Sequence, residues 1–187
     1  MKKFELTNEF ITNMFGTKLF RIRALVEFGD VEAGELGGYV EKESNLGHDD
    51  NAWVYDNAWV YGNARVYGDA LVYDNARVYG NARVYGNALV CGDARVCGDA
   101  RVCGNGDYAY AHGFGSVNRT TTFFRLKDGG VGVRCGCFYG TLAQFRDKIR
   151  ETHGETKKAQ EYLMLADLME LRFEEDENEV GNRKYVE

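Results

Sequence analysis

The chain has 187 residues, with 23 glycines, 12 tyrosines and no proline. Average usage of about 5% would give roughly nine prolines, so their absence favours a fold that uses nearly every backbone N–H. The net charge of −6 argues against binding of an extended nucleic acid, no apolar run approaches the roughly 18 residues of a membrane span, and the start MKKFELTNEF lacks the apolar stretch of a secretory signal.

Residues 1–44 are predicted to form an N-terminal β module that leads into a repeat. FELT and LFRIRALV have the composition of short strands, and they flank a turn at residues 13–16. The segment GELGGYVEKESNLGHDD resembles a degenerate copy of the units that follow. We expect it to begin the first coil.

Nine successive hexapeptides occupy residues 51–104: NAWVYD, NAWVYG, NARVYG, DALVYD, NARVYG, NARVYG, NALVCG, DARVCG and DARVCG. Position two is always Ala and position four is always Val, so both point to the same side of an extended strand. The Gly/Asp–Asn/Asp pair between units turns the chain. Because Ala and Val would make a poor core between flat sheets, we predict a mainly β protein in which coiled, stacked strands enclose a narrow interior.

A coil of three hexapeptides, 18 residues long, sorts position three into three walls. Wall one carries Trp53, Leu71 and Leu89; wall two carries Trp59, Arg77 and Arg95; wall three carries Arg65, Arg83 and Arg101. Aspartate replaces the turn glycine only at Asp56 and Asp74, again 18 residues apart. The sorting predicts triangular coils over 51–68, 69–86 and 87–104, within a β-helix spanning 45–118. Stacked strands need their N–H groups, which accounts for the missing prolines.

The remaining segments are predicted to form a C-terminal module over 119–187. Residues 105–118 should make one irregular coil, and TTTFFRL and VGVRCGCF should pair as a hairpin around residues 127–130. Thr141 can cap a helix that ends at Gly154. A second helix, roughly 156–174, has a wide apolar arc that favours contact on two sides, and the acidic tail EEDENE should be solvated.

The pattern V-x-G-[ND]-A-x resembles the hexapeptide repeat of left-handed parallel β-helices, and this resemblance implies the handedness. KKFELT…KLFRIRAL…FGDVEAGELGGYVEKESNL and GSVNRTTTFFRLKDGGVGVRCGCFYGT are similar to a group of uncharacterised hexapeptide-repeat proteins of phages and prophages. That likeness implies a phage-type accessory factor but supplies no catalytic residues. Left-handed β-helices are usually trimers, so a homotrimer is expected, and many are acyltransferases that use acetyl-CoA or acyl carrier protein.

The histidines and cysteines give little support to catalysis. His48, His112 and His153 all lie outside the uninterrupted repeat, and their spacing does not indicate a metal site. We interpret them as surface or capping residues and expect no metal and no cofactor. Three cysteines occupy one repeat position on different walls, too far apart for a disulfide, and no C-x-x-C pair occurs. The cysteines are therefore expected to be reduced thiols in a bacterial cytosol; they are Cys91, Cys97, Cys103, Cys135 and Cys137.

Arginines beside tyrosines are the most suggestive binding feature, because guanidinium groups and aromatic faces suit phosphates and nucleobases. The candidate wall residues are Arg65, Arg77, Arg83, Arg95 and Arg101, with Tyr67, Tyr79 and Tyr85. A second candidate patch is the hydroxyl-rich segment SVNRTTT, residues 116–122, together with Lys127, Arg134 and His153. Its candidate ligand residues are Ser116, Asn118, Arg119 and His153. A trimer interface, or a solvated ladder balanced by the five aspartates of the repeat, would also explain the wall arginines.

The leading hypothesis is a non-catalytic binding protein. It would sequester a small anionic, nucleotide-like ligand or inhibit a host defence protein. The alternatives are a hexapeptide-repeat acyltransferase and a purely structural or assembly module. The pattern leaves open whether Trp53, Leu71 and Leu89 are covered by the protein's own helices or by another subunit.

Overall fold

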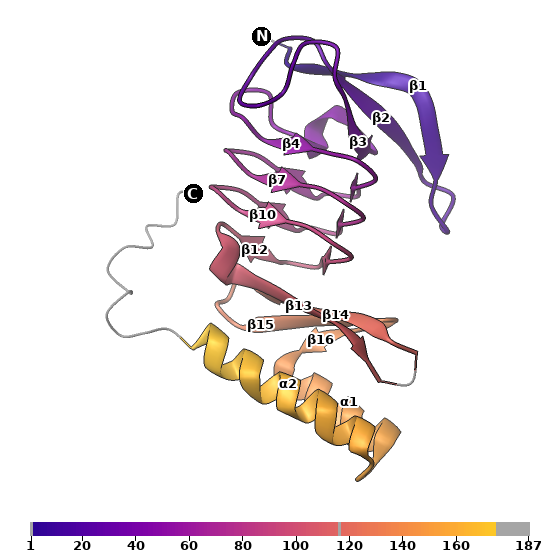
Figure 1. The fold of residues 1–187 in the computed structure, drawn as a ribbon, viewed down its shortest axis with the longest axis vertical. Helices are drawn as coiled ribbons and strands as arrows, with labels where there is room; N and C mark the ends of the chain where they lie inside the picture. The colour runs from indigo at the N-terminus through magenta and orange to yellow at the C-terminus, as the bar shows by residue number, and fades with distance from the viewer. Residues whose placement is uncertain (1, 116, 175–187) are drawn as a thin grey trace.

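The computed structural model describes residues 2–115 and 117–174, and it places a central β-solenoid between two terminal modules (Figure 1). The predicted site residue Ser116 and the acidic tail from residue 175 onward lie outside the described residues. None of the helices in the described ranges is long and apolar enough to cross a membrane.

The N-terminal module is a hairpin joined to the first coil. Strands β1 (Phe4–Thr12) and β2 (Lys18–Ala24) are antiparallel, and the Gly16 N–H donates to the Asn13 carbonyl at 3.0 Å in the turn. The predicted hairpin is thus confirmed. Strand β3 (Leu36–Val40) pairs antiparallel with β2 and parallel with β5 (Trp59–Val60). A short 3-10 turn, η1 (Glu43–Asn45), follows. The sheet of the N-terminal module therefore continues into the solenoid.

Nine two-residue strands form the regular coils. Besides β5 they are β4 (Trp53–Val54), β6 (Arg65–Val66), β7 (Leu71–Val72), β8 (Arg77–Val78), β9 (Arg83–Val84), β10 (Leu89–Val90), β11 (Arg95–Val96) and β12 (Arg101–Val102). They stack in parallel as β4-β7-β10, β5-β8-β11 and β6-β9-β12. These are walls one, two and three, so the 18-residue sorting is confirmed. The left-handed sense of the coils stays a prediction.

The interior of the solenoid is filled by the two invariant repeat positions. Every alanine at position two and every valine at position four, from Ala52 to Val102, is completely buried. The backbone is bonded from coil to coil, as where the N–H of Arg77 donates to the Ala94 carbonyl at 2.9 Å. At two corners Asp56 and Asp74 adopt φ of 50° and 59°, a left-handed conformation that aspartate tolerates better than most residues.

Wall one is covered at its first coil by the N-terminal module and not by the helices. The Trp53 ring is fully buried and packs edge-on against Phe28 and Phe4, with ring centroids 5.3 and 6.2 Å apart. Further along the wall, Leu71 and Leu89 are half-buried.

The irregular coil expected for residues 105–118 is wrong. After the 3-10 turn η2 (Asn105–Asp107), strand β13 (Tyr108–Phe114) pairs antiparallel with β14 (Arg119–Arg125) in a sheet that continues through β15 (Val131–Cys135) and β16 (Phe138–Thr141). Tyr108 takes the place that valine has in the hexapeptide register, and it packs against the end of the solenoid interior. Its hydroxyl donates to the Leu89 carbonyl at 2.6 Å. The predicted hairpin of β14 and β15 is confirmed.

Two helices cover the C-terminal sheet (Figure 1). Helix α1 (Leu142–His153) is capped by Thr141 and ends before Gly154, as predicted. Helix α2 (Lys157–Phe173) buries one face against the sheet and α1. The opposite apolar face, which consists of Met164, Leu168 and Leu171, is exposed in this chain. The expected contact on a second side therefore stays a prediction.

Candidate ligand-binding cleft

The candidate site lies where wall two meets the C-terminal module. The β1–β2 and β13–β14 hairpins extend toward the same side of the solenoid (Figure 1). Against this wall lies a cavity of about 510 Å³, which we call the arginine cleft. It is lined by Asn75, Arg77, Asp93, Arg95, His112, Asn118, Arg119, Thr120 and Gly136. Four predicted ligand residues, from two regions of the sequence, therefore share one cavity.

Two guanidinium groups form the floor of the arginine cleft. Arg77 and Arg95 are paired in register on β8 and β11, and the Arg77 guanidinium lies 4.0 Å from the centre of the Trp59 ring. The pKa of Arg77 is lowered, first by burial and then by the charge of Arg95. Both causes disfavour the cation, so a bound anion would relieve the electrostatic cost of this floor.

The C-terminal sheet supplies the opposite side of the cleft. The Arg95 backbone N–H donates to Thr122 Oγ1 at 2.9 Å, and this bond ties β14 to the floor. Arg119, at the start of β14, lies against Gly136 so closely that a Cβ there would overlap its guanidinium. Gly136 has φ of 59°, a backbone conformation that favours glycine at this position.

The balance of charge in the cleft is positive. Within residues 2–115 and 117–174, none of Arg77, Arg95 and Arg119 forms an ion pair with a carboxylate. Asp93 is the acidic side chain among the lining residues. Its charge raises the pKa of Arg77 less than the charge of Arg95 lowers it. His112 adds a ring whose Nδ1 lies 2.9 Å from Thr120 Oγ1. The cleft is suited to an anion with several oxygen acceptors.

The other predicted wall residues lie elsewhere. Arg65, Arg83 and Arg101 stack on wall three, and an Arg101 nitrogen donates to the Ala100 carbonyl at 2.8 Å. The nearby rings of Tyr67 and Tyr85 stack at 5.2 Å. The structure does not bring these arginines to the cleft. A solvated ladder and a subunit interface both stay predictions for wall three.

Tyr79 occupies the corner that follows wall two. Its ring stacks on Tyr61 with centroids 5.0 Å apart, and the buried Cys97 continues this column. Burial, and then the neighbouring Cys97, raise the pKa of Tyr79. The phenol therefore stays neutral, and its role is to pack the corner.

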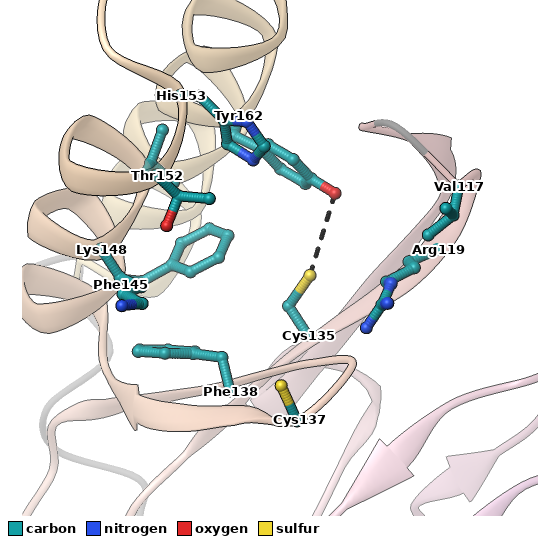
Figure 2. A pocket seen from close by; sticks show the side chains of 11 residues that line it. Val117, Arg119, Cys135, Cys137, Phe138, Phe145, Lys148, Thr152, His153 and Tyr162 are labelled. Atoms are coloured by element: carbon teal, nitrogen blue, oxygen red, sulfur yellow. Dashed lines mark hydrogen bonds between the residues drawn. The ribbon is translucent and has the colours of Figure 1, made fainter.

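His153 belongs to a second cavity, on the far side of Arg119. This cavity of about 270 Å³ lies between the helices and the C-terminal sheet (Figure 2), and we call it the aromatic pocket. Its lining residues are Val117, Arg119, Cys135, Cys137, Phe138, Phe145, Lys148, Ile149, Thr152, His153 and Tyr162. Burial and then Cys135 raise the pKa of Tyr162 to about 12, and its hydroxyl donates to the Phe114 carbonyl at 3.2 Å.

The remaining histidine and the other predicted cations are placed outside both cavities. His48 stacks on Phe4 at 4.4 Å, and its Nδ1 accepts from the Lys3 backbone N–H at 3.2 Å, so it joins the N-terminal module to the first coil. Lys127 and Arg134 do not line the arginine cleft. In the described ranges, no three His, Cys, Asp or Glu side chains gather as a metal site, and the described cysteines are free thiols.

Sequence reasoning missed four of the residues that line the cleft: Asn75, Asp93, His112 and Gly136. Asp93 and Asn75 occupy position one of their hexapeptides, a turn position with no chemical signal of its own. Thr120 belongs to the segment SVNRTTT of the second predicted patch, and it lines the cleft together with Asn118 and Arg119. His112 was assigned to the irregular exit, and its place in the cleft follows from β13 joining the C-terminal sheet.

Comparison with known families supports the architecture. The family model described as YdcK beta solenoid repeat matches residues 58–74, 64–80, 70–84, 76–92 and 82–98. These overlapping matches advance mostly by one hexapeptide and lie within the regular coils. A search of curated proteins gives no match. The chain is thus a β-solenoid repeat protein, and the matches do not extend to the C-terminal module that completes the cleft.

Proposed function

We propose that this β-solenoid protein is a non-catalytic binding protein that holds a small phosphate-bearing anion in the arginine cleft. The observation that carries the proposal is the meeting of Arg77, Arg95 and Arg119 in one cavity. Two come from the repeat and one from the C-terminal module, so a ligand bound there would contact both.

The chemistry of the lining favours phosphate over a simple carboxylate. Three guanidinium groups provide several parallel N–H donors, and phosphate offers matching oxygens on more than one side. Asn118, Thr120 and His112 add polar groups around these cations. The cavity of about 510 Å³ lies in the usual range for small-molecule sites.

Calorimetry with inorganic pyrophosphate tests the proposal. Charged hydrogen bonds contribute roughly 1.5–3 kcal/mol each, so Arg77→Ala or Arg95→Ala should weaken binding by about ten- to a hundredfold. Arg83→Ala is the matched control, because Arg83 has the same repeat position on wall three. The proposal is wrong if wild-type protein binds no pyrophosphate, or if Arg83→Ala weakens binding as much as the two cleft variants.

A protein that binds such an anion without converting it would act by sequestration. We place it in the bacterial cytosol as a phage-type accessory factor that withdraws a nucleotide-like signal, and a homotrimer would multiply the sites. Incubation of a nucleotide panel with excess protein, followed by ultrafiltration and chromatography, should deplete one nucleotide and return it unchanged after denaturation. Recovery of a modified product would contradict the non-catalytic part of the proposal.

One observation favours acyl transfer as a second candidate. His112 lines the cleft beside Thr120, where it could serve as the base that a hexapeptide-repeat acyltransferase needs. Acetyl-CoA turnover that is lost in His112→Ala but kept in His48→Ala would establish this activity. Absence of turnover with a panel of amine and hydroxyl acceptors would leave binding as the function of the cleft.

A further inference from the structure

The aromatic pocket and the arginine cleft are neighbours that share Arg119. Arg119 lines both cavities, and the turn between β15 and β16 contributes Gly136 to the cleft and Cys135 and Cys137 to the pocket. The Arg119 charge also acts on the Tyr162 phenol at the other side of the pocket, lowering its pKa against the larger effect of burial. Arg119 therefore stands between the two spaces.

Three aromatic rings give the pocket its shape. Phe145 is tilted against Phe138 with centroids 5.5 Å apart, and it meets Tyr162 edge-on at 5.8 Å. Figure 2 shows these rings on the side of the helices and the β15–β16 turn, with Val117 and Arg119 on the strand opposite. Rings in such varied orientations offer faces and edges to another ring, and the sulfurs of Cys135 and Cys137 are polarisable partners.

Cations accompany this apolar lining. The cations Arg119 and Lys148 line the pocket, and its lining contains no carboxylate. Lys148 is paired with Glu151 at 2.8 Å, and the His153 ring stacks on Tyr162 at 5.9 Å. Arg119 is therefore the cation best placed to meet a ligand that also enters the cleft.

We propose that the aromatic pocket holds the planar aromatic group of the ligand whose phosphate lies in the arginine cleft. The inference rests on the proposed function, and it narrows the natural ligand to an aryl or nucleoside phosphate, which should bind more tightly than a sugar phosphate. The volume of about 270 Å³ is sufficient, since an apolar cavity of about 150 Å³ takes a benzene ring.

Matched ligand pairs test this assignment by calorimetry. AMP differs from ribose 5-phosphate by its base, and phenyl phosphate differs from methyl phosphate by its ring. We expect the aromatic member of at least one pair to bind at least tenfold more tightly. Thr152→Trp and Val117→Trp, at exposed positions that line opposite sides of the pocket, should remove this gain and leave pyrophosphate binding unchanged.

Ala143→Trp is the control, because Ala143 is exposed on the same helix but does not line the pocket. If pyrophosphate binds but neither aromatic ligand gains affinity, or if both pocket variants keep the gain, the pocket assignment is overturned and the cleft stands. If pyrophosphate does not bind to the wild-type protein, the proposed function fails and this inference fails with it. Circular dichroism verifies that each variant is folded.

Discussion

Lys3 shows at the scale of one residue how the N-terminal module is attached to the solenoid. Its side chain is buried, with the ammonium donating to the carbonyls of Asp50 and Ala52 at 2.6 and 2.8 Å. The nitrogen also lies 4.5 Å from the centre of the Phe28 ring. Burial lowers the pKa of Lys3 to about 8, although the charges of Asp50 and Asp49 oppose the shift. A charged group thus joins segments far apart in the sequence, at an electrostatic cost.

The lowered pKa of Lys3 predicts a specific pH dependence of stability. The unfolded chain keeps its proton up to a pKa near 10.5, whereas the folded protein releases it near 8. The cost of burying the charged amine is fully present below pH 8. The free energy of unfolding should therefore rise, relative to that of a variant without this amine, as pH increases from about 8 to 10.5. Urea unfolding of wild type and Lys3→Met across this range measures the difference.

Comparison with Lys3→Met cancels the contributions of tyrosines and cysteines that titrate at similar pH. Lys2→Met serves as a second control, because Lys2 is exposed and pairs with Glu43 on the surface. If the free energy of unfolding of wild type falls relative to that of Lys3→Met between pH 8 and 10.5, the lowered pKa of Lys3 is contradicted.

Helix α1 shows at the scale of one element that local sequence can set both ends. The Thr141 hydroxyl accepts from the Gln144 N–H at 3.3 Å, and the Gln144 side chain accepts from the Thr141 N–H at 2.9 Å. At the other end the Gly154 N–H donates to the Arg150 carbonyl at 2.9 Å. These bonds involve residues within four positions of each other, so the sequence alone could predict the cap at Thr141 and the end at Gly154.

Removal of this cap should cost stability without changing the fold. Thr141→Ala leaves an N–H of the first turn without its acceptor and should lower the free energy of unfolding by about 1 kcal/mol. Thermal or urea unfolding measures the change. Thr152→Ala, at an exposed position in the same helix, should lower the free energy of unfolding by less than half as much. Equal losses in the two variants would contradict a stabilising role of the cap.

At the scale of the whole molecule, the repeat couples the two terminal modules. Wall two runs from the N-terminal hairpin through β3, β5 and β8 to β11, and β11 bonds to the C-terminal sheet through Arg95 and Thr122. One continuous wall therefore links the two modules, and the arginine cleft forms where this wall meets the C-terminal module.

Deletion of one complete coil should preserve the architecture. Without residues 69–86, Leu89 would follow Trp53 on wall one and Arg95 would follow Trp59 on wall two, so the stack should shorten by about 4.8 Å and unfold cooperatively. Deletion of residues 69–77 is the control, because it breaks the hexapeptide period and points interior valines outward. Cooperative unfolding of both variants, or of neither, would contradict an 18-residue structural unit. Circular dichroism melts provide the measurement.

The sequence by itself determined the solenoid, its three walls, the β14–β15 hairpin and the limits of both helices. The reason is that the residues of each wall recur every 18 positions in the sequence, and that turns and helix caps depend on residues close together in the chain. It also identified Arg77, Arg95, Asn118 and Arg119 as ligand candidates, although as members of separate patches.

Only the tertiary structure decided which candidates meet. The docking of β14 on β11 brings Arg119 to Arg77 and Arg95 and leaves the equally suggestive arginines of wall three outside. The tertiary structure also pairs β13 with β14 in an antiparallel sheet, and it places His153 in the lining of the aromatic pocket. These outcomes rest on packing between segments that no repeat relates, so the repeat pattern that fixed the scaffold carried no information about the cleft.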